Sequence, residues 1–118
     1  MDKIQLPQVI KKFIAASNKP DPKAFVDCFA NEAIVVDEGQ ERTGKLAIKK
    51  WSDESHFGFN VKLDPVAARQ DDEAIVTFKL SGDYDKTGLP DPLLLDFHFH
   101  IHDGYIKSLL ITENGKHV

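Results

Sequence analysis

The chain has 118 residues and a mass of 13.3 kDa, with 42% hydrophobic residues, 29% charged residues and a net charge of −4. Domains cluster at about 100–150 residues, so we expect one domain that spans residues 1–118. The negative charge and the presence of only two arginines leave no basic stripe for nucleic acid, which excludes that class of partner.

Two further classes of protein are excluded by the sequence. A single cysteine, Cys28, cannot form an internal disulfide framework. No apolar run approaches the about 18 residues of a membrane-spanning helix, and no signal-like segment precedes the first helix. We therefore expect a cytoplasmic protein that has no membrane partner.

The first half of the chain predicts three helices. The first carries an apolar stripe at helical spacing, made of Leu6, Val9, Ile10, Phe13 and Ile14. Pro20 ends it. Asp21 can then cap a second helix, with Pro22 in the first turn, where a missing N–H costs nothing. A third helix is expected at residues 45–54.

Alternating hydrophobicity predicts strands at residues 33–37, 61–69, 74–80, 93–102 and 105–112. Asp103-Gly104 is a strong hairpin signal between the last two. Pro65 cannot donate a ladder hydrogen bond, which predicts a bulge or an edge. Residues 82–92 have the composition of a long, turn-rich connection. Helices followed by antiparallel strands indicate an α+β fold.

Two segments carry recognisable motifs: residues 21–51, DPKAFVDCFANEAIVVDEGQERTGKLAIKKW, and residues 93–113, LLLDFHFHIHDGYIKSLLITE. The first resembles the start, and the second the last hairpin, of the nuclear transport factor 2-like superfamily. The resemblance implies a cone-shaped, curved antiparallel sheet wrapped around three N-terminal helices. It also implies a pocket inside the cone and a homodimer as the usual assembly.

Within the superfamily, these motifs are similar to those of ketosteroid isomerases and SnoaL-like polyketide cyclases. The resemblance implies that Asp37, at the end of a strand, is the base. It implies that Asp96, on the penultimate strand, donates a hydrogen bond to the developing enolate. The isomerase tyrosine on the first helix is replaced by Phe13, and supporting tyrosines are replaced by Phe29 and Ser52.

The two aspartates each have a functional and a structural interpretation. Alternation places Asp37 on the face of Val35, where burial would raise the pKa of a base, but strand-end aspartates also serve in turns. Asp96 lies inside a strand, where aspartate is depleted. Inside a cone it would be protonated, as the corresponding acid is in ketosteroid isomerases, or hydrogen-bonded structurally.

Three histidines share a strand face with Asp96. His98, His100 and His102 alternate with apolar residues, so all of them lie on that face. His98 is the nearest to Asp96, and the pair could act as acid and base. An alternating histidine pair can bind zinc, but no further ligand follows at a suitable spacing, so we expect no metal.

We therefore predict a small, cofactor-independent isomerase, cyclase or dehydratase that acts on an apolar or carbonyl-containing molecule. Asp37, Asp96 and His98 would be catalytic, in a pocket lined by Phe13, Phe29, Val35, Trp51, Leu94 and Leu109. The alternative is a non-catalytic binding or dimerisation module on the same fold. The apolar row Phe97, Phe99 and Ile101 predicts a homodimer through the outer sheet face, because exposing such side chains is costly.

Overall fold

The computed structural model describes residues 6–37, 39–70, 73–85, 87–89 and 93–113. In chain order the elements are α1 (Gln8–Asn18), α2 (Pro22–Asp27), β1 (Phe29–Asp37), β2 (Gln40–Thr43), α3 (Lys45–Trp51), the π-helical turn η1 (Ser52–His56), the 3₁₀ turn η2 (Phe57–Phe59), β3 (Lys62–Gln70), β4 (Ala74–Ser81), β5 (Leu93–His102) and β6 (Tyr105–Glu113).

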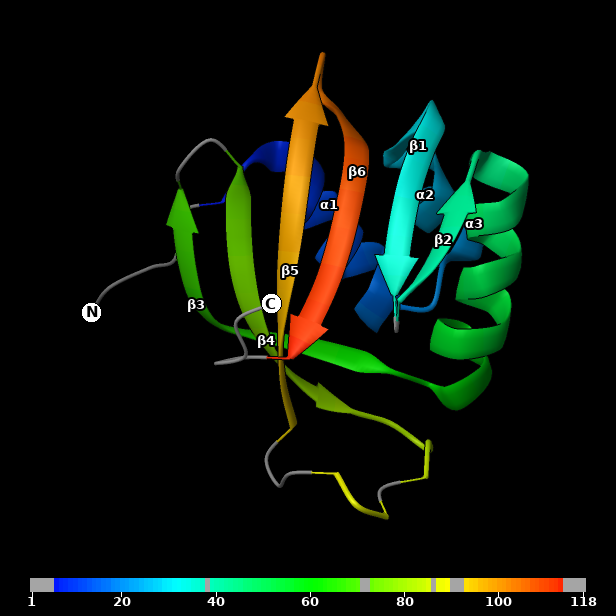
Figure 1. The fold of residues 1–118 in the computed structure, drawn as a ribbon, viewed down its shortest axis with the longest axis vertical. Coiled ribbons are helices and arrows are strands. Elements are labelled where there is room, and N and C mark those ends of the chain that lie inside the picture. The colour runs from blue at the N-terminus through cyan, green and yellow to red at the C-terminus, as the bar shows by residue number, and fades with distance from the viewer. Residues whose placement is uncertain (1–5, 38, 71–72, 86, 90–92, 114–118) are drawn as a thin grey trace.

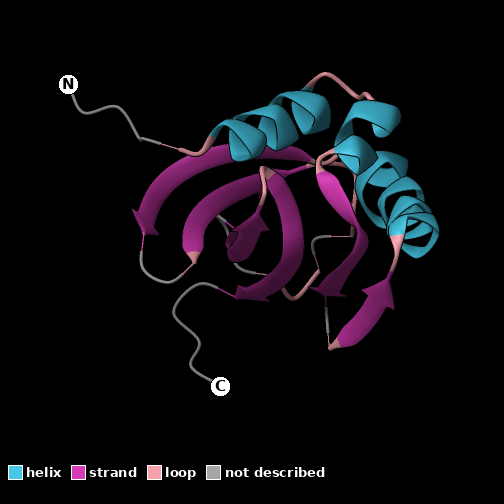
Figure 2. Cartoon of the chain, turned by 90° about the horizontal axis from the view of Figure 1, so that it is seen from above, coloured by secondary structure: helices cyan, strands magenta, loops and turns pink. Residues whose placement is uncertain are grey.

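The six strands form one curled sheet in the order β2-β1-β6-β5-β4-β3 (Figure 1). The helices gather along one side of this sheet, and the sheet curls without closing (Figure 2). The predicted α+β class, with a curved sheet and N-terminal helices, is confirmed. One detail differs, because β1 pairs with β6 in parallel while the other neighbours are antiparallel.

Local sequence signals set several element boundaries as predicted. The Asp21 side chain accepts a hydrogen bond from the Ala24 N–H and caps α2, and Pro22 occupies the first turn. Asp103 and Gly104 both have positive φ, at 53° and 80°, as a two-residue hairpin turn requires. The β3–β4 register shifts after Pro65, which confirms the bulge.

Other boundaries differ from the predicted ones. Strand β1 begins at Phe29, four residues earlier than expected, because it pairs there with Ile106 of β6. Strand β2 has no alternating apolar pattern and was not predicted; it forms by pairing with β1. Helix α3 ends at Trp51, and a π-helical turn continues it to His56. The polar sequence Gln70-Asp71-Asp72 predicts a turn between the strands expected at residues 61–69 and 74–80, but residues 71–72 lie outside the described residues, as does part of residues 82–92.

The core lies between the helices and one face of the sheet, which we call the helix face. Phe13 of α1 packs its ring against Phe97 and Phe99 of β5, with centroids 6.2 and 5.2 Å apart. Ile101, half-buried, also packs against this core. The prediction that these three β5 residues form an outer dimer face is therefore wrong. Since side chains alternate along a strand, the residues between them lie on the opposite, outer face.

Candidate functional site

Asp37 lies at the end of β1, on the helix face, where it meets α3. The indole Nε1–H of Trp51 donates a hydrogen bond to Asp37 Oδ2 at 3.0 Å. Arg42 donates to the backbone carbonyl of Asp37 and not to its carboxylate. No other hydrogen bond reaches this carboxylate from the described part of the chain, so one oxygen keeps its lone pairs available.

Asp96 lies on the outer face, because its strand neighbour Phe97 is packed under α1. The Thr77 hydroxyl of β4 donates to Asp96 Oδ1 at 2.6 Å, across a directly paired position. The expectation that Asp37 and Asp96 point into one cavity is therefore not met. The two carboxylates lie on opposite faces of the sheet, with the core beside β5 filled by phenylalanine rings.

His98 shares the outer face with Asp96 and is held by cross-strand contacts. Its Nδ1 lies 3.2 Å from Glu73 Oε1, and its Nε2 lies 3.1 Å from Thr112 Oγ1. The side chain is 18% exposed. Both ring nitrogens thus have partners on the outer face, and His98 cannot act together with Asp37 across the sheet.

The predicted pocket-lining residues are mostly core residues. Five of the six are buried: Phe13, Phe29, Val35, Trp51 and Leu109. Leu94 is half-buried and alternates onto the outer face. The rings of Phe13, Phe25 and Phe29 pack against one another, with centroids 4.7 to 6.1 Å apart.

A buried pair that the sequence did not reveal joins α1 to the π-helical turn. Ser17 Oγ and His56 Nε2 share a hydrogen bond, and His56 is only 5% exposed. Loss of hydration on burial lowers the pKa of His56 from 6.5 to about 4, and the nearby Lys62 acts in the same direction. The residues are 39 positions apart, so no spacing rule could have joined them.

A groove of about 810 Å³ opens between α1, α2 and the β5–β6 turn; we call it the α1–α2 groove. Its walls include the apolar or small side chains of Val9, Ala15, Ala16, Ala24, Cys28 and Ile101. Charged side chains surround them: Lys12, Lys19, Asp21, Asp27 and Asp103. This volume lies within the range of small-molecule sites, about 300–1,000 Å³.

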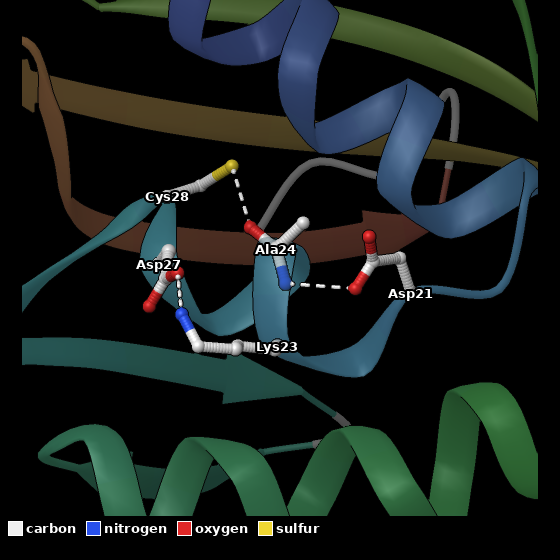
Figure 3. Close-up of polar contacts among 5 residues, drawn as sticks. All are labelled: Asp21, Lys23, Ala24, Asp27 and Cys28. Carbon is white, nitrogen blue, oxygen red and sulfur yellow. Dashed lines mark hydrogen bonds and ion pairs between the residues drawn. The ribbon is translucent and has the colours of Figure 1, made fainter.

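The wall formed by α2 is held by local hydrogen bonds (Figure 3). The Asp21 carboxylate accepts from the Ala24 N–H at 3.2 Å, and Lys23 donates to Asp27 at 2.9 Å. The Cys28 thiol donates to the Ala24 carbonyl, at 3.4 Å. The groove is therefore walled by a short helix whose polar groups are already engaged.

A second cavity, of about 490 Å³, lies on the other side of the β5–β6 turn. Phe29 contributes to its wall and is the one predicted pocket residue that lines either of the two cavities. Asp103 and Tyr105 line both cavities, so the hairpin tip separates them. The predicted ligand site and the observed cavities thus coincide only at Phe29.

Two other kinds of feature are absent from the described residues. No group of three or more His, Cys, Asp or Glu side chains gathers there as metal ligands would. No helix in the same ranges is long and apolar enough to cross a membrane.

The fold and the sequence together place the chain in a known class. The SnoaL-like domain matches residues 10–109, so the chain belongs to the SnoaL-like family. A proposed polyketide cyclase from Sinorhizobium meliloti is 30% identical, with a TM-score of 0.81 over 91% of this chain and 95% of that one. No curated protein matches the sequence significantly.

More distant structures share the fold. A hypothetical protein from Catenulispora acidiphila with a ketosteroid isomerase-like fold, in complex with trimethylamine, has a TM-score of 0.75 and 23% identity, and the match covers 92% of this chain and 86% of that one. A proposed polyketide cyclase from Pseudomonas putida also reaches 0.75, at 20% identity over 96% and 94% of the two chains. These similarities show a nuclear transport factor 2-like architecture.

Proposed function

We propose that this SnoaL-like protein binds a small organic molecule in the α1–α2 groove. The observation that carries the proposal is the groove itself, which combines a volume of about 810 Å³ with an apolar floor and a charged rim. Ligand sites have this composition, because apolar walls supply affinity while a few polar groups set orientation. Binding is favoured over two-carboxylate catalysis, since Asp37 and Asp96 lie on opposite faces of the sheet.

The proposal is tested by filling the groove. Ala15 is exposed and lines it, so Ala15→Trp occupies the groove without overpacking the core. We expect a neutral apolar fluorophore, N-phenyl-1-naphthylamine, to bind the wild type and to bind Ala15→Trp about tenfold more weakly. Ala67→Trp, at an exposed alanine of β3 outside the groove, is the matched control. Equal binding by Ala15→Trp and the wild type would exclude the groove as the site.

A second function, proton transfer by a single carboxylate, is favoured by the contact between Trp51 and Asp37. The indole fixes one carboxylate oxygen, which leaves the other free to accept a proton from a carbon next to a carbonyl. The family likeness to proposed polyketide cyclases supports this chemistry.

Deuterium exchange into a panel of ketones tests the second function. We expect Asp37→Asn to slow exchange about a hundredfold or more, because the amide cannot accept the proton. Asp64→Asn, at an exposed aspartate of β3, should leave the rate unchanged. Exchange that Asp37→Asn does not slow would show that Asp37 is not the base.

A further inference from the structure

The aspartates around the α1–α2 groove already have partners. Asp21 accepts from the backbone N–H of Ala24, Asp27 is paired with Lys23, and Asp103 lies 3.3 Å from His102 Nε2. The first two contacts are visible in Figure 3. The negative charge of the rim is thus partly engaged by the protein itself.

The two lysines of the groove differ from these aspartates. Among the described residues, neither Lys12 nor Lys19 makes a side-chain hydrogen bond or an ion pair. Lys12 lies in α1, and Lys19 directly follows the last residue of that helix. The two lysines are seven positions apart, which corresponds to about two helical turns. Ala15 and Ala16 lie between them, so small side chains separate the two ammonium groups.

The floor of the groove carries no charge that would oppose an anion. Burial raises the pKa of the Cys28 thiol to about 11, so Cys28 stays neutral at physiological pH. Two charged side chains act on the Cys28 thiol electrostatically: Lys12 lowers its pKa and Asp27 raises it, and the effect of Lys12 is the larger of the two. The remaining floor residues, such as Val9 and Ile101, offer apolar contact.

We propose that the ligand of the α1–α2 groove is a small monocarboxylate with an apolar chain, its carboxylate bound by Lys12 or Lys19 and its chain lying on the apolar floor. This inference rests on the proposed binding function and adds the chemical class of the ligand. Within the described residues the two rim lysines have no side-chain partner, and the charge of Asp27 is offset by Lys23. Asp21 and Asp103 keep their negative charge, so we place the ligand carboxylate at the lysines and away from these two aspartates. Ammonium–carboxylate hydrogen bonds are charge-assisted and favour such a ligand over a neutral one.

Octanoate and 1-octanol test the inference, because they share a chain length and differ in charge. We expect octanoate to bind the wild-type protein about tenfold more tightly than 1-octanol at low salt, measured by titration calorimetry. The double variant Lys12→Met and Lys19→Met should bind the two compounds equally. The matched control is Lys11→Met with Lys50→Met, which removes the same charge from exposed sites outside the groove.

The outcomes separate this inference from the proposed function. If both compounds bind equally to the wild type, and Ala15→Trp weakens both, the groove binds ligands but does not select carboxylates. If the control double variant loses as much selectivity as the groove variant, the preference comes from overall charge, and the inference is wrong. If neither compound nor the neutral fluorophore binds, the binding function and the inference both fail.

Discussion

His56 is a single residue whose ionisation links stability to pH. Its pKa is lowered from 6.5 to about 4 in the folded protein, so between these values the unfolded chain binds more protons than the folded chain. The contribution of neutral His56 to the free energy of unfolding is therefore fully present above pH 6.5, and it decreases as the pH falls towards 4. Each unit of pKa difference is about 1.4 kcal/mol, so the loss is on the order of 3 kcal/mol.

Urea unfolding at pH 7 and pH 4.5 measures this effect. We expect His56→Gln to lose less stability than the wild type over this range, because the amide keeps a hydrogen-bonding group near Ser17 but cannot be protonated. His102→Gln, at an exposed histidine, is the control and should follow the wild type. Parallel pH dependence of wild type and His56→Gln would contradict the assignment.

Among the elements, α2 depends on its N-cap because it has only six residues. Asp21→Ala leaves the Ala24 N–H without its side-chain acceptor, and we expect a loss of about 1 kcal/mol in the free energy of unfolding. Asp64→Ala, on the exposed side of β3, should change this free energy little. An unchanged denaturation midpoint for Asp21→Ala would mean that water replaces the cap without cost.

At the scale of the whole molecule, the homodimer stays a prediction. Because Phe97, Phe99 and Ile101 face the helices, we expect such a dimer to use other residues of the outer sheet face. The outer face presents Leu110, 41% exposed, on β6 between β5 and β1. We expect light scattering to give a dimer mass at micromolar concentration, and Leu110→Lys to give a monomer. Leu46→Lys, at an 87% exposed leucine of α3, should remain dimeric. A monomeric wild type would remove the prediction.

Much of the fold could be predicted from local patterns. Short-range interactions determine the Asp21-Pro22 start of α2 and the Asp103-Gly104 turn, because the backbone geometry at both places depends on the residues themselves. Strand β2 could not be predicted in this way, because its four polar residues become a strand only by pairing with β1.

The candidate site shows where sequence reasoning reached its limit. Alternation along β5 correctly separated the row of Phe97 from the row of Asp96. The isomerase resemblance then placed the polar row inside, whereas the hydrophobic pattern alone favours burial of the phenylalanines. The packing of Phe97 under Phe13 shows that hydrophobic burial set the orientation.

Residues close together in the chain were enough to specify the family, the α+β class, the cap of α2 and the β5–β6 hairpin. Long-range packing was needed to establish which face of β5 meets the helices, that His56 reaches Ser17, and that a groove opens beside Lys12 and Lys19. These features depend on how elements distant in sequence come together. Alternation and helical periodicity define the two faces of an element, and packing selects the one that is buried.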